Sequence, residues 1–195
     1  QNSLTANMFS SFIAVNNGGK FTFTEMPMWA QAGPLFGMTN FDVDGNGFED
    51  ILCTGNNYNT RVPHGRDDAQ PSFVLFNDGG TFRYQSGSRN GLYNQDDGKS
   101  LMIVPGPKNE VRVLIANNNG KLRGYKTMNG KSQPQGVQFV KSPIAASYAK
   151  VTVNGSVKMV HLNNGNGYLS AGANGIWKTK GVGNIEFYDV NGKRL

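Results

Sequence analysis

Short apolar runs separated by turn-forming residues recur along the whole chain. Near the N-terminus, residues 12–15 (FIAV) and 21–23 (FTF) flank the tetrapeptide Asn-Asn-Gly-Gly at 16–19. Asn and Gly tolerate the positive φ angles that tight turns require, so this segment predicts a β-hairpin. No stretch of ten or more residues carries the i, i+3, i+4 apolar spacing of an amphipathic helix. We therefore expect an all-β protein.

The hairpin pattern returns 61 residues further along the chain. Residues 73–84 repeat residues 12–23 position for position, as strand, Asn-Asn/Asp-Gly-Gly and strand. A period of this size indicates repeated supersecondary units, none of which buries its apolar faces alone. We expect a first domain at residues 1–127, made of two units at about 10–60 and 72–127.

A polar linker rich in Pro and Gly at residues 128–136 (MNGKSQPQG) predicts the boundary of this domain. Beyond it, residues 149–153 and 157–162 flank an Asn-Gly pair, which is a strong hairpin signal. We expect residues 128–195 to form a small C-terminal β module.

An acidic loop with candidate metal chemistry lies between residues 41 and 55 (FDVDGNGFEDILCTG). Asp42, Asp44 and Asn46 place oxygen atoms at every second position, and Asp50 closes the loop. Calcium takes six to eight oxygen ligands in a flexible geometry, and the backbone carbonyl of Phe48 offers another. The sequence therefore predicts a Ca²⁺ site at Asp42, Asp44, Asn46, Phe48 and Asp50.

Two alternatives compete with this interpretation. An EF-hand also begins D-x-D-x-[DN]-G, but its twelfth position requires a bidentate Glu, where this chain has Cys53, and a strand follows in place of a helix. The other alternative is a solvated turn, rich in Asp and Asn, that binds no ion. In the second unit, residues 94–98 (NQDDG) are interpreted as a degenerate counterpart, because they lack the alternation and the closing acid.

The longest polar stretch, at residues 56–72, is a candidate ligand-binding loop, because loops on rigid scaffolds often carry function. The alternative is a surface loop held by local ion pairs. The candidate ligand-binding residues are Tyr58, His64, Arg66, Asp67 and Asp68.

Composition excludes several classes of protein. The net charge of +6 comes from scattered Lys and Arg without a cluster, so we do not expect nucleic-acid binding. No apolar run approaches the length of a membrane span. The single cysteine, Cys53, forms no intrachain disulfide, and we expect it to be buried. Only two histidines occur, His64 and His161, and no common catalytic motif is present, so we expect no enzymatic activity.

The unit that ends in DVDGNGFEDILCTGNN resembles the FG-GAP/VCBS repeat, the calcium-binding blade of integrin-α-like β-propellers. Asp42, Asp44, Asn46 and Asp50 match the calcium ligands of that family, with Asn at the third ligand. Residues 162–170 (LNNGNGYLS) resemble a motif of the ASPIC/UnbV module, although Ala171 replaces its Gln. The resemblance implies about two propeller-blade-like antiparallel sheets, followed by the C-terminal module.

The resemblance also implies a secreted, non-catalytic calcium-binding protein that acts in extracellular recognition or adhesion of a protein or carbohydrate. Calcium is abundant outside the cell, so we expect an exported chain whose signal peptide has been removed; the alternative is a cytoplasmic protein. Two blades do not close a propeller, which needs about four to eight. The chain is therefore a fragment of a longer propeller, a compact β-sandwich, or a structural subunit that joins copies of itself through open sheet edges.

Overall fold

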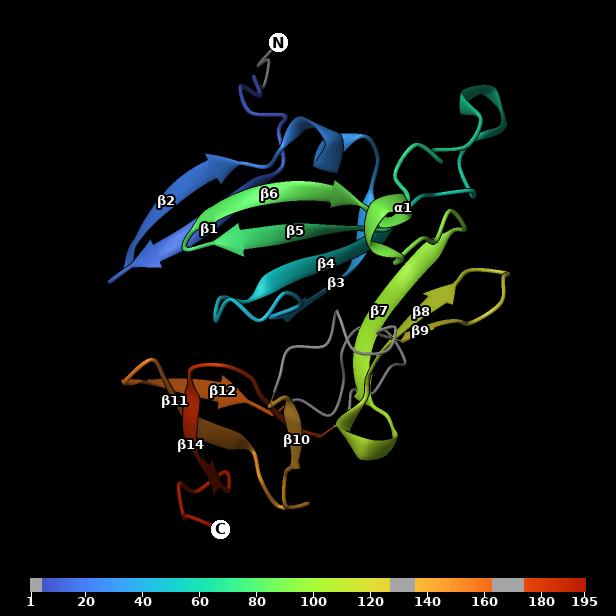
Figure 1. The fold of residues 1–195 in the computed structure, drawn as a ribbon. Helices are drawn as coiled ribbons and strands as arrows, with labels where there is room; N and C mark the ends of the chain where they lie inside the picture. The colour runs from blue at the N-terminus through green and yellow to red at the C-terminus, as the bar shows by residue number, and fades with distance from the viewer. Residues whose placement is uncertain (1–4, 127–135, 163–173) are drawn as a thin grey trace.

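The structure, a computed structural model, describes residues 5–126, 136–162 and 174–195 (Figure 1). Antiparallel strands dominate these residues and the helices are short, which confirms the all-β prediction. The strands are β1 (Phe12–Asn17), β2 (Lys20–Glu25), β3 (Leu35–Phe41), β4 (Asp50–Gly55), β5 (Phe73–Asp78), β6 (Thr81–Ser86), β7 (Gly98–Pro105), β8 (Val111–Asn117), β9 (Arg123–Lys126), β10 (Gln138–Lys141), β11 (Tyr148–Val153), β12 (Ser156–His161), β13 (Gly175–Lys178) and β14 (Val182–Tyr188). The helices are η1 (Met28–Gln31), η2 (Val62–His64), α1 (Gly87–Asn90) and η3 (Pro107–Asn109).

The described strands form five antiparallel sheets. Their strand orders are β1-β2, β3-β4-β5-β6, β7-β8-β9, β12-β11-β14 and β10-β13. The hairpin β1-β2 and the strands that follow residue 136 lie at opposite ends of the molecule (Figure 1). Strand β13, which the sequence did not predict, pairs with β10.

The two predicted repeat hairpins have the same turn. In each, two glycines adopt positive φ, at 67° and 94° for Gly18 and Gly19 and at 67° and 106° for Gly79 and Gly80. The first Asn side chain of each turn accepts a hydrogen bond of 2.7 Å from the second glycine N–H. The repeated sequence therefore forms a repeated local structure.

The boundaries of the sheets do not coincide with the boundaries of the two sequence units. Strand β4 of the first unit pairs with β5 of the second, with Ile51 opposite Leu75. One four-stranded sheet therefore combines β3 and β4 of the first unit with the hairpin β5-β6 of the second.

Strand β5 is buried on both faces, because its side chains alternate between two cores. Val74 and Phe76 join a core shared with β7 and β8. Phe73 and Leu75 pack on the opposite face with Ala30 and with Cys53, which is fully buried as expected. This continuous burial explains the unbroken apolar run in β5.

The four-stranded and three-stranded sheets approach each other along their first strands. A Cβ atom at Gly37 of β3 would lie 2.8 Å from the backbone nitrogen of Leu101 in β7. A side chain at position 37 would therefore separate the two sheets.

The strands after residue 136 form a small core of their own and also contact the strands before it. The predicted hairpin around the Asn-Gly pair is present as β11-β12. Trp177 of β13 packs edge-on against Phe41 at the end of β3, with ring centroids 5.6 Å apart. The predicted linker at 128–136 lies outside the described residues except for Gly136, and the motif at 162–170 lies outside them except for Leu162.

The Lys99 side chain connects the three-stranded sheet, to which it belongs, with the four-stranded sheet. Lys99 Nζ lies 2.6 Å from Oδ1 of the buried Asp97 and donates a hydrogen bond of 3.1 Å to the carbonyl of Asn56. It also lies 3.7 Å from the centre of the Phe36 ring. Burial raises the pKa of Asp97, but the hydrogen bonds from Lys99 and Asn118 and the Lys99 charge outweigh it and lower the pKa below 3.8.

We predict that Lys99→Met destabilises the protein by about 3 kcal/mol, because it leaves the buried Asp97 carboxylate without its cation. Urea unfolding at pH 7 measures this change. In the native protein the ion pair contributes fully above about pH 4, and its contribution is lost as the pH falls through the lowered pKa. Lys20→Met, at the exposed β1-β2 turn, is the matched control and should change stability by less than about 0.5 kcal/mol. An equal effect of both substitutions would contradict the prediction.

Candidate metal site

The acidic loop lies between β3 and β4, and its local structure follows from its glycines. Gly45 and Gly47 adopt φ angles of 77° and 98°, which turn the chain back on itself. Asp42 accepts hydrogen bonds from the N–H groups of both glycines, at 2.8 and 3.1 Å. The loop therefore wraps around the Asp42 carboxylate.

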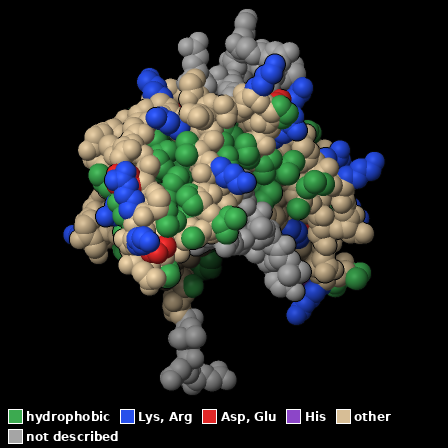
Figure 2. Space-filling model, turned by 90° about the horizontal axis from the view of Figure 1, so that it is seen from below, with side chains coloured by type: hydrophobic (Ala, Val, Ile, Leu, Met, Phe, Trp, Pro, Cys, Tyr) green, Lys and Arg blue, Asp and Glu red, His purple; other side chains and the backbone are tan. Residues whose placement is uncertain are grey.

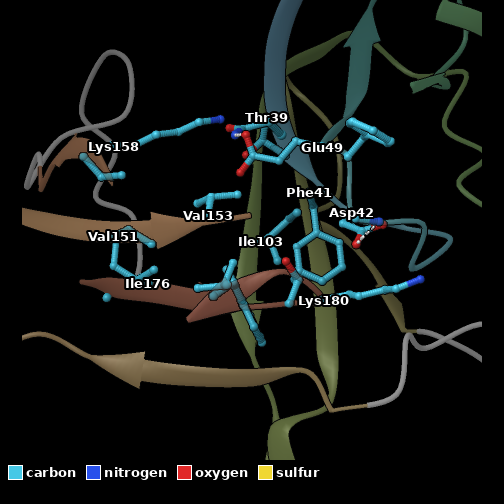
Figure 3. A pocket seen from close by; sticks show the side chains of 18 of the residues that line it. Thr39, Phe41, Asp42, Glu49, Ile103, Val151, Val153, Lys158, Ile176 and Lys180 are labelled. Atoms are coloured by element: carbon cyan, nitrogen blue, oxygen red, sulfur yellow. Dashed lines mark hydrogen bonds between the residues drawn. The ribbon is translucent and has the colours of Figure 1, made fainter. Parts of the chain in front are cut away.

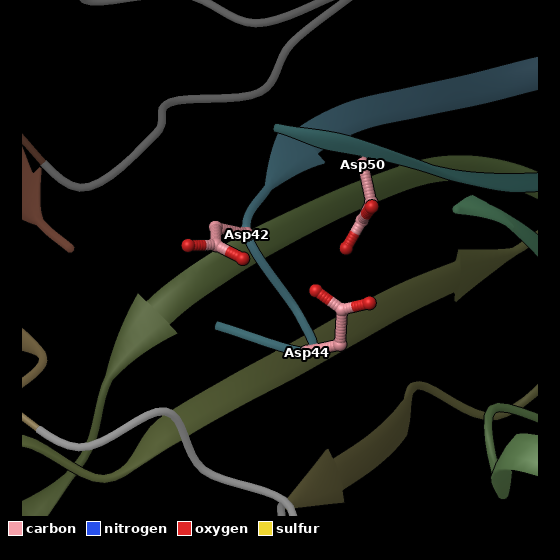
Figure 4. Close-up of side chains that lie close together, drawn as sticks. All are labelled: Asp42, Asp44 and Asp50. Carbon is pink, nitrogen blue, oxygen red and sulfur yellow. The ribbon is translucent and has the colours of Figure 1, made fainter. Parts of the chain in front are cut away.

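Three carboxylates converge in this loop (Figure 4). One oxygen from each of Asp42, Asp44 and Asp50 lies within 4.8 Å of the others. Asp42 is 1% exposed and Asp50 is fully buried, whereas Asp44 is exposed. This arrangement offers a small cation three carboxylate oxygens.

Asp50 anchors the loop to the sheet. Its two oxygens accept hydrogen bonds of 2.8 Å from the backbone N–H groups of Val43 and Asn77. Asn77 belongs to β5, so this side chain holds the loop against the neighbouring strand.

The charges of this cluster are not compensated by a basic side chain. In the described part of the chain, no Lys, Arg or His forms an ion pair with Asp42, Asp44 or Asp50. Burial, with a smaller contribution from the charges of Asp44 and Asp42, raises the pKa of Asp50 to about 6, against the effect of its backbone hydrogen bonds. Burial also raises the pKa of Asp42. A bound cation would offset the unfavourable free energy of keeping these carboxylates ionised in the buried loop.

The other two residues of the predicted site have additional contacts. Asn46 accepts a hydrogen bond of 2.8 Å from the N–H of Phe48 and donates one of 3.0 Å to the carbonyl of Asn77. Asn46 therefore braces the loop against β5. Phe48 was predicted for its carbonyl; its ring is 47% exposed and lies near Gly79 of the β5-β6 turn.

The second unit has no equivalent acidic loop. The connection that corresponds to the one between β3 and β4 lies between β7 and β8, and it contains η3 and no Asp. Residues 94–98, interpreted from the sequence as the degenerate counterpart, instead lead into β7, which begins at Gly98. Their two carboxylates are already paired, Asp96 with Arg123 at 2.9 Å and Asp97 with Lys99 at 2.6 Å. Arg123 and Lys99 already neutralise these two carboxylates, so no metal ion is required there.

The acidic loop also forms one wall of a cleft against the C-terminal module (Figure 3). The cleft encloses about 840 Å³. Asp42 and Glu49 lie on the loop side, and Lys158 and Lys180 lie on the module side. The candidate metal site therefore lies at the junction of the two parts of the chain.

The structure brings together only part of the predicted ligand-binding set. The Arg66 guanidinium lies over the Tyr58 ring, 4.6 Å from its centre. Asp67 pairs with Asn57 through two backbone hydrogen bonds of 2.8 and 2.9 Å, so its backbone closes the loop. His64, in η2, and Asp68 are exposed.

The basic side chains do not form one large patch on the face that Figure 2 shows. Lys and Arg side chains there are spread in small separate groups among apolar side chains (Figure 2). In the three described ranges, no helix has both the length and the hydrophobicity needed to cross a membrane. Comparison of the chain with protein-family models, with curated proteins and with solved structures finds no match.

We predict that, in the presence of a chelator, the protein loses on the order of 2 kcal/mol of stability as the pH rises from about 4 to 6.5. The pKa of Asp50 is raised from 3.8 to about 6, so the folded state binds more protons than the unfolded state in this window. Stability therefore falls as the pH rises and becomes constant above the folded pKa. Urea unfolding across this range measures the slope.

Saturating calcium should remove this slope, because a cation favours the ionised carboxylates. The Asp97 pair acts in the opposite direction but below about pH 4, so the two effects are separable. If the stability in chelator rises with pH between about 4 and 6.5, the raised pKa of Asp50 in the ion-free protein is wrong.

Proposed function

We propose that this protein is a secreted, non-catalytic β-repeat protein in which a calcium ion stabilises the acidic loop and neighbouring loops recognise a partner outside the cell. The observation that carries the proposal is the contrast between its buried acids. Asp97 has a lysine partner, whereas Asp42 and Asp50 are buried with no basic partner in the part of the chain that the structure describes. A divalent cation supplies the missing charge.

Calcium is favoured among hard cations by the kind of ligand that the loop offers. Three carboxylates and nearby backbone carbonyls supply oxygen atoms without an imposed octahedral arrangement, which suits calcium better than magnesium. Such a site contributes its binding free energy to the stability of the fold. The resemblance to the FG-GAP/VCBS repeat supports the same ion and an extracellular setting.

We predict that Asp44→Asn lowers the Tm only when calcium is present. In saturating calcium, the substitution should lower the Tm by about 5 °C or more, because it removes one carboxylate ligand. In chelator, the Tm should stay the same or rise slightly, since the Asp44 charge raises the pKa values of Asp42 and Asp50. Differential scanning calorimetry measures both values.

Asp78→Asn is the matched control, because Asp78 is an exposed acid at the nearby β5-β6 turn. It should leave the calcium response unchanged. A wild-type Tm that is the same in calcium and in chelator would overturn the calcium assignment.

A second candidate function is that of a subunit that associates with copies of itself. The hairpin β1-β2 exposes large apolar side chains, with Phe12, Phe21 and Phe23 at 43%, 54% and 56%. Their counterparts in the repeat are Phe73, Phe82 and Tyr84, which belong to the core on one face of the four-stranded sheet. The same face is thus covered in one hairpin and uncovered in the other, which favours an intermolecular contact.

If the protein self-associates through this face, light scattering of the purified chain should show a multimer, and Phe23→Lys should shift the mass towards that of the monomer. Val190→Lys is the control, because Val190 is 80% exposed in the C-terminal part of the chain. A monomer in both calcium and chelator would exclude this second function.

A further inference from the structure

A second hollow lies beside the predicted ligand-binding loop. It encloses about 760 Å³ and is lined by three segments that are distant in the sequence. Tyr58 and Arg66 come from the 56–72 loop, Asp96 precedes β7, and Lys121 and Arg123 come from the chain after β8. The hollow is thus formed only when the two large sheets pack together.

The charges in this hollow leave two cations available. Asp96 accepts hydrogen bonds of 3.0 and 2.9 Å from the Arg123 guanidinium, and Asp97 is paired with Lys99. Arg66 and Lys121 have no ion-pair partner among the described residues. An incoming ligand therefore meets a net positive charge.

Arg66 is held in place before any ligand arrives. Its guanidinium stacks on the Tyr58 ring, and the Tyr58 hydroxyl donates a hydrogen bond of 2.7 Å to the carbonyl of Gln95. The ends of the loop are fixed by Asn56, whose side chain accepts a hydrogen bond from the N–H of Gln70 and donates one to Gln95. The stacked guanidinium keeps its edge free for a planar, two-point contact with a carboxylate.

The rest of the lining suits a hydroxylated ring better than an acidic peptide. Asn59, Asn118 and Asn119 also line the hollow, and Gly120 adds no side chain there. The Asn118 amide already donates a hydrogen bond of 3.0 Å to Asp97, which leaves its oxygen for a ligand. Amides act as both donors and acceptors, as sugar hydroxyl groups require. We propose that this hollow binds an acidic saccharide, with its carboxylate between Arg66 and Lys121. The proposal rests on the recognition function proposed above and names its ligand class.

Isothermal titration calorimetry of the protein, at fixed free calcium, tests this proposal with two matched pairs of probes. Sialyllactose and cellobiouronic acid carry a carboxylate, whereas lactose and cellobiose do not. At least one acidic probe should bind, with its neutral partner weaker by about tenfold or more. Added salt should weaken binding further.

Variants connect the binding to the two cations. Arg66→Ala and Lys121→Ala should each reduce the affinity by about tenfold while keeping the wild-type Tm. Arg89→Ala and Lys20→Ala remove exposed cations elsewhere and should leave the affinity unchanged.

The following outcomes would overturn the saccharide assignment. They are equal binding of acidic and neutral probes, no binding of either acidic probe, or stronger binding of a short polyglutamate peptide, which would indicate an acidic protein partner. None of them changes the calcium dependence of the Tm, so failure of this proposal is distinct from failure of the calcium assignment.

Discussion

The fold depends on compensation of the charge on each buried carboxylate. Moving an ionised carboxylate out of water costs several kcal/mol unless an opposite charge or hydrogen bonds compensate for it. This chain meets that requirement in two ways. Lys99 compensates Asp97 where the two large sheets meet. Asp42 and Asp50 have backbone N–H donors and, among the described residues, no basic partner. The first arrangement needs no ion from the solution, and the second, as we propose, makes the fold respond to calcium.

The two carboxylate sites lie at different contacts of the fold, so they stabilise different parts of it. Asp97 and Lys99 connect the ends of β4 and β7, so they stabilise the contact between sheets. The acidic loop instead braces β3 and β4 against β5 and forms one wall of the cleft to the C-terminal module. A cation in that loop would stiffen the place where the two parts of the chain meet. Its effect would therefore extend beyond the loop itself.

Features encoded within a few residues could be predicted from the sequence. The hairpin turns at Gly18 and Gly79 and the convergence of Asp42 and Asp44 depend on neighbouring residues, so their patterns were sufficient. Features that join distant segments could not be predicted. The pairing of β4 with β5 crosses the repeat boundary, and Arg123 reaches Asp96 over 27 residues. No local pattern indicates which distant partner completes such a contact.

The apolar face of the hairpin β5-β6 is buried and that of β1-β2 is exposed, because different segments of the chain pack against the two hairpins. The base of β1-β2 is fixed by Gln31, which accepts a hydrogen bond of 2.8 Å from the N–H of Ser11 and donates one of 2.7 Å to the carbonyl of Met26. The connection from Met26 to Leu35 then packs on β5 of the next hairpin and covers its Phe73 and Leu75. The hairpin β5-β6 is thus covered by a connection that comes before it in the chain. In the described residues, β1-β2 has no such connection over Phe21 and Phe23, so its apolar face stays uncovered although its sequence matches that of β5-β6. Burial in this fold is therefore a property of neighbouring units and not of a single unit.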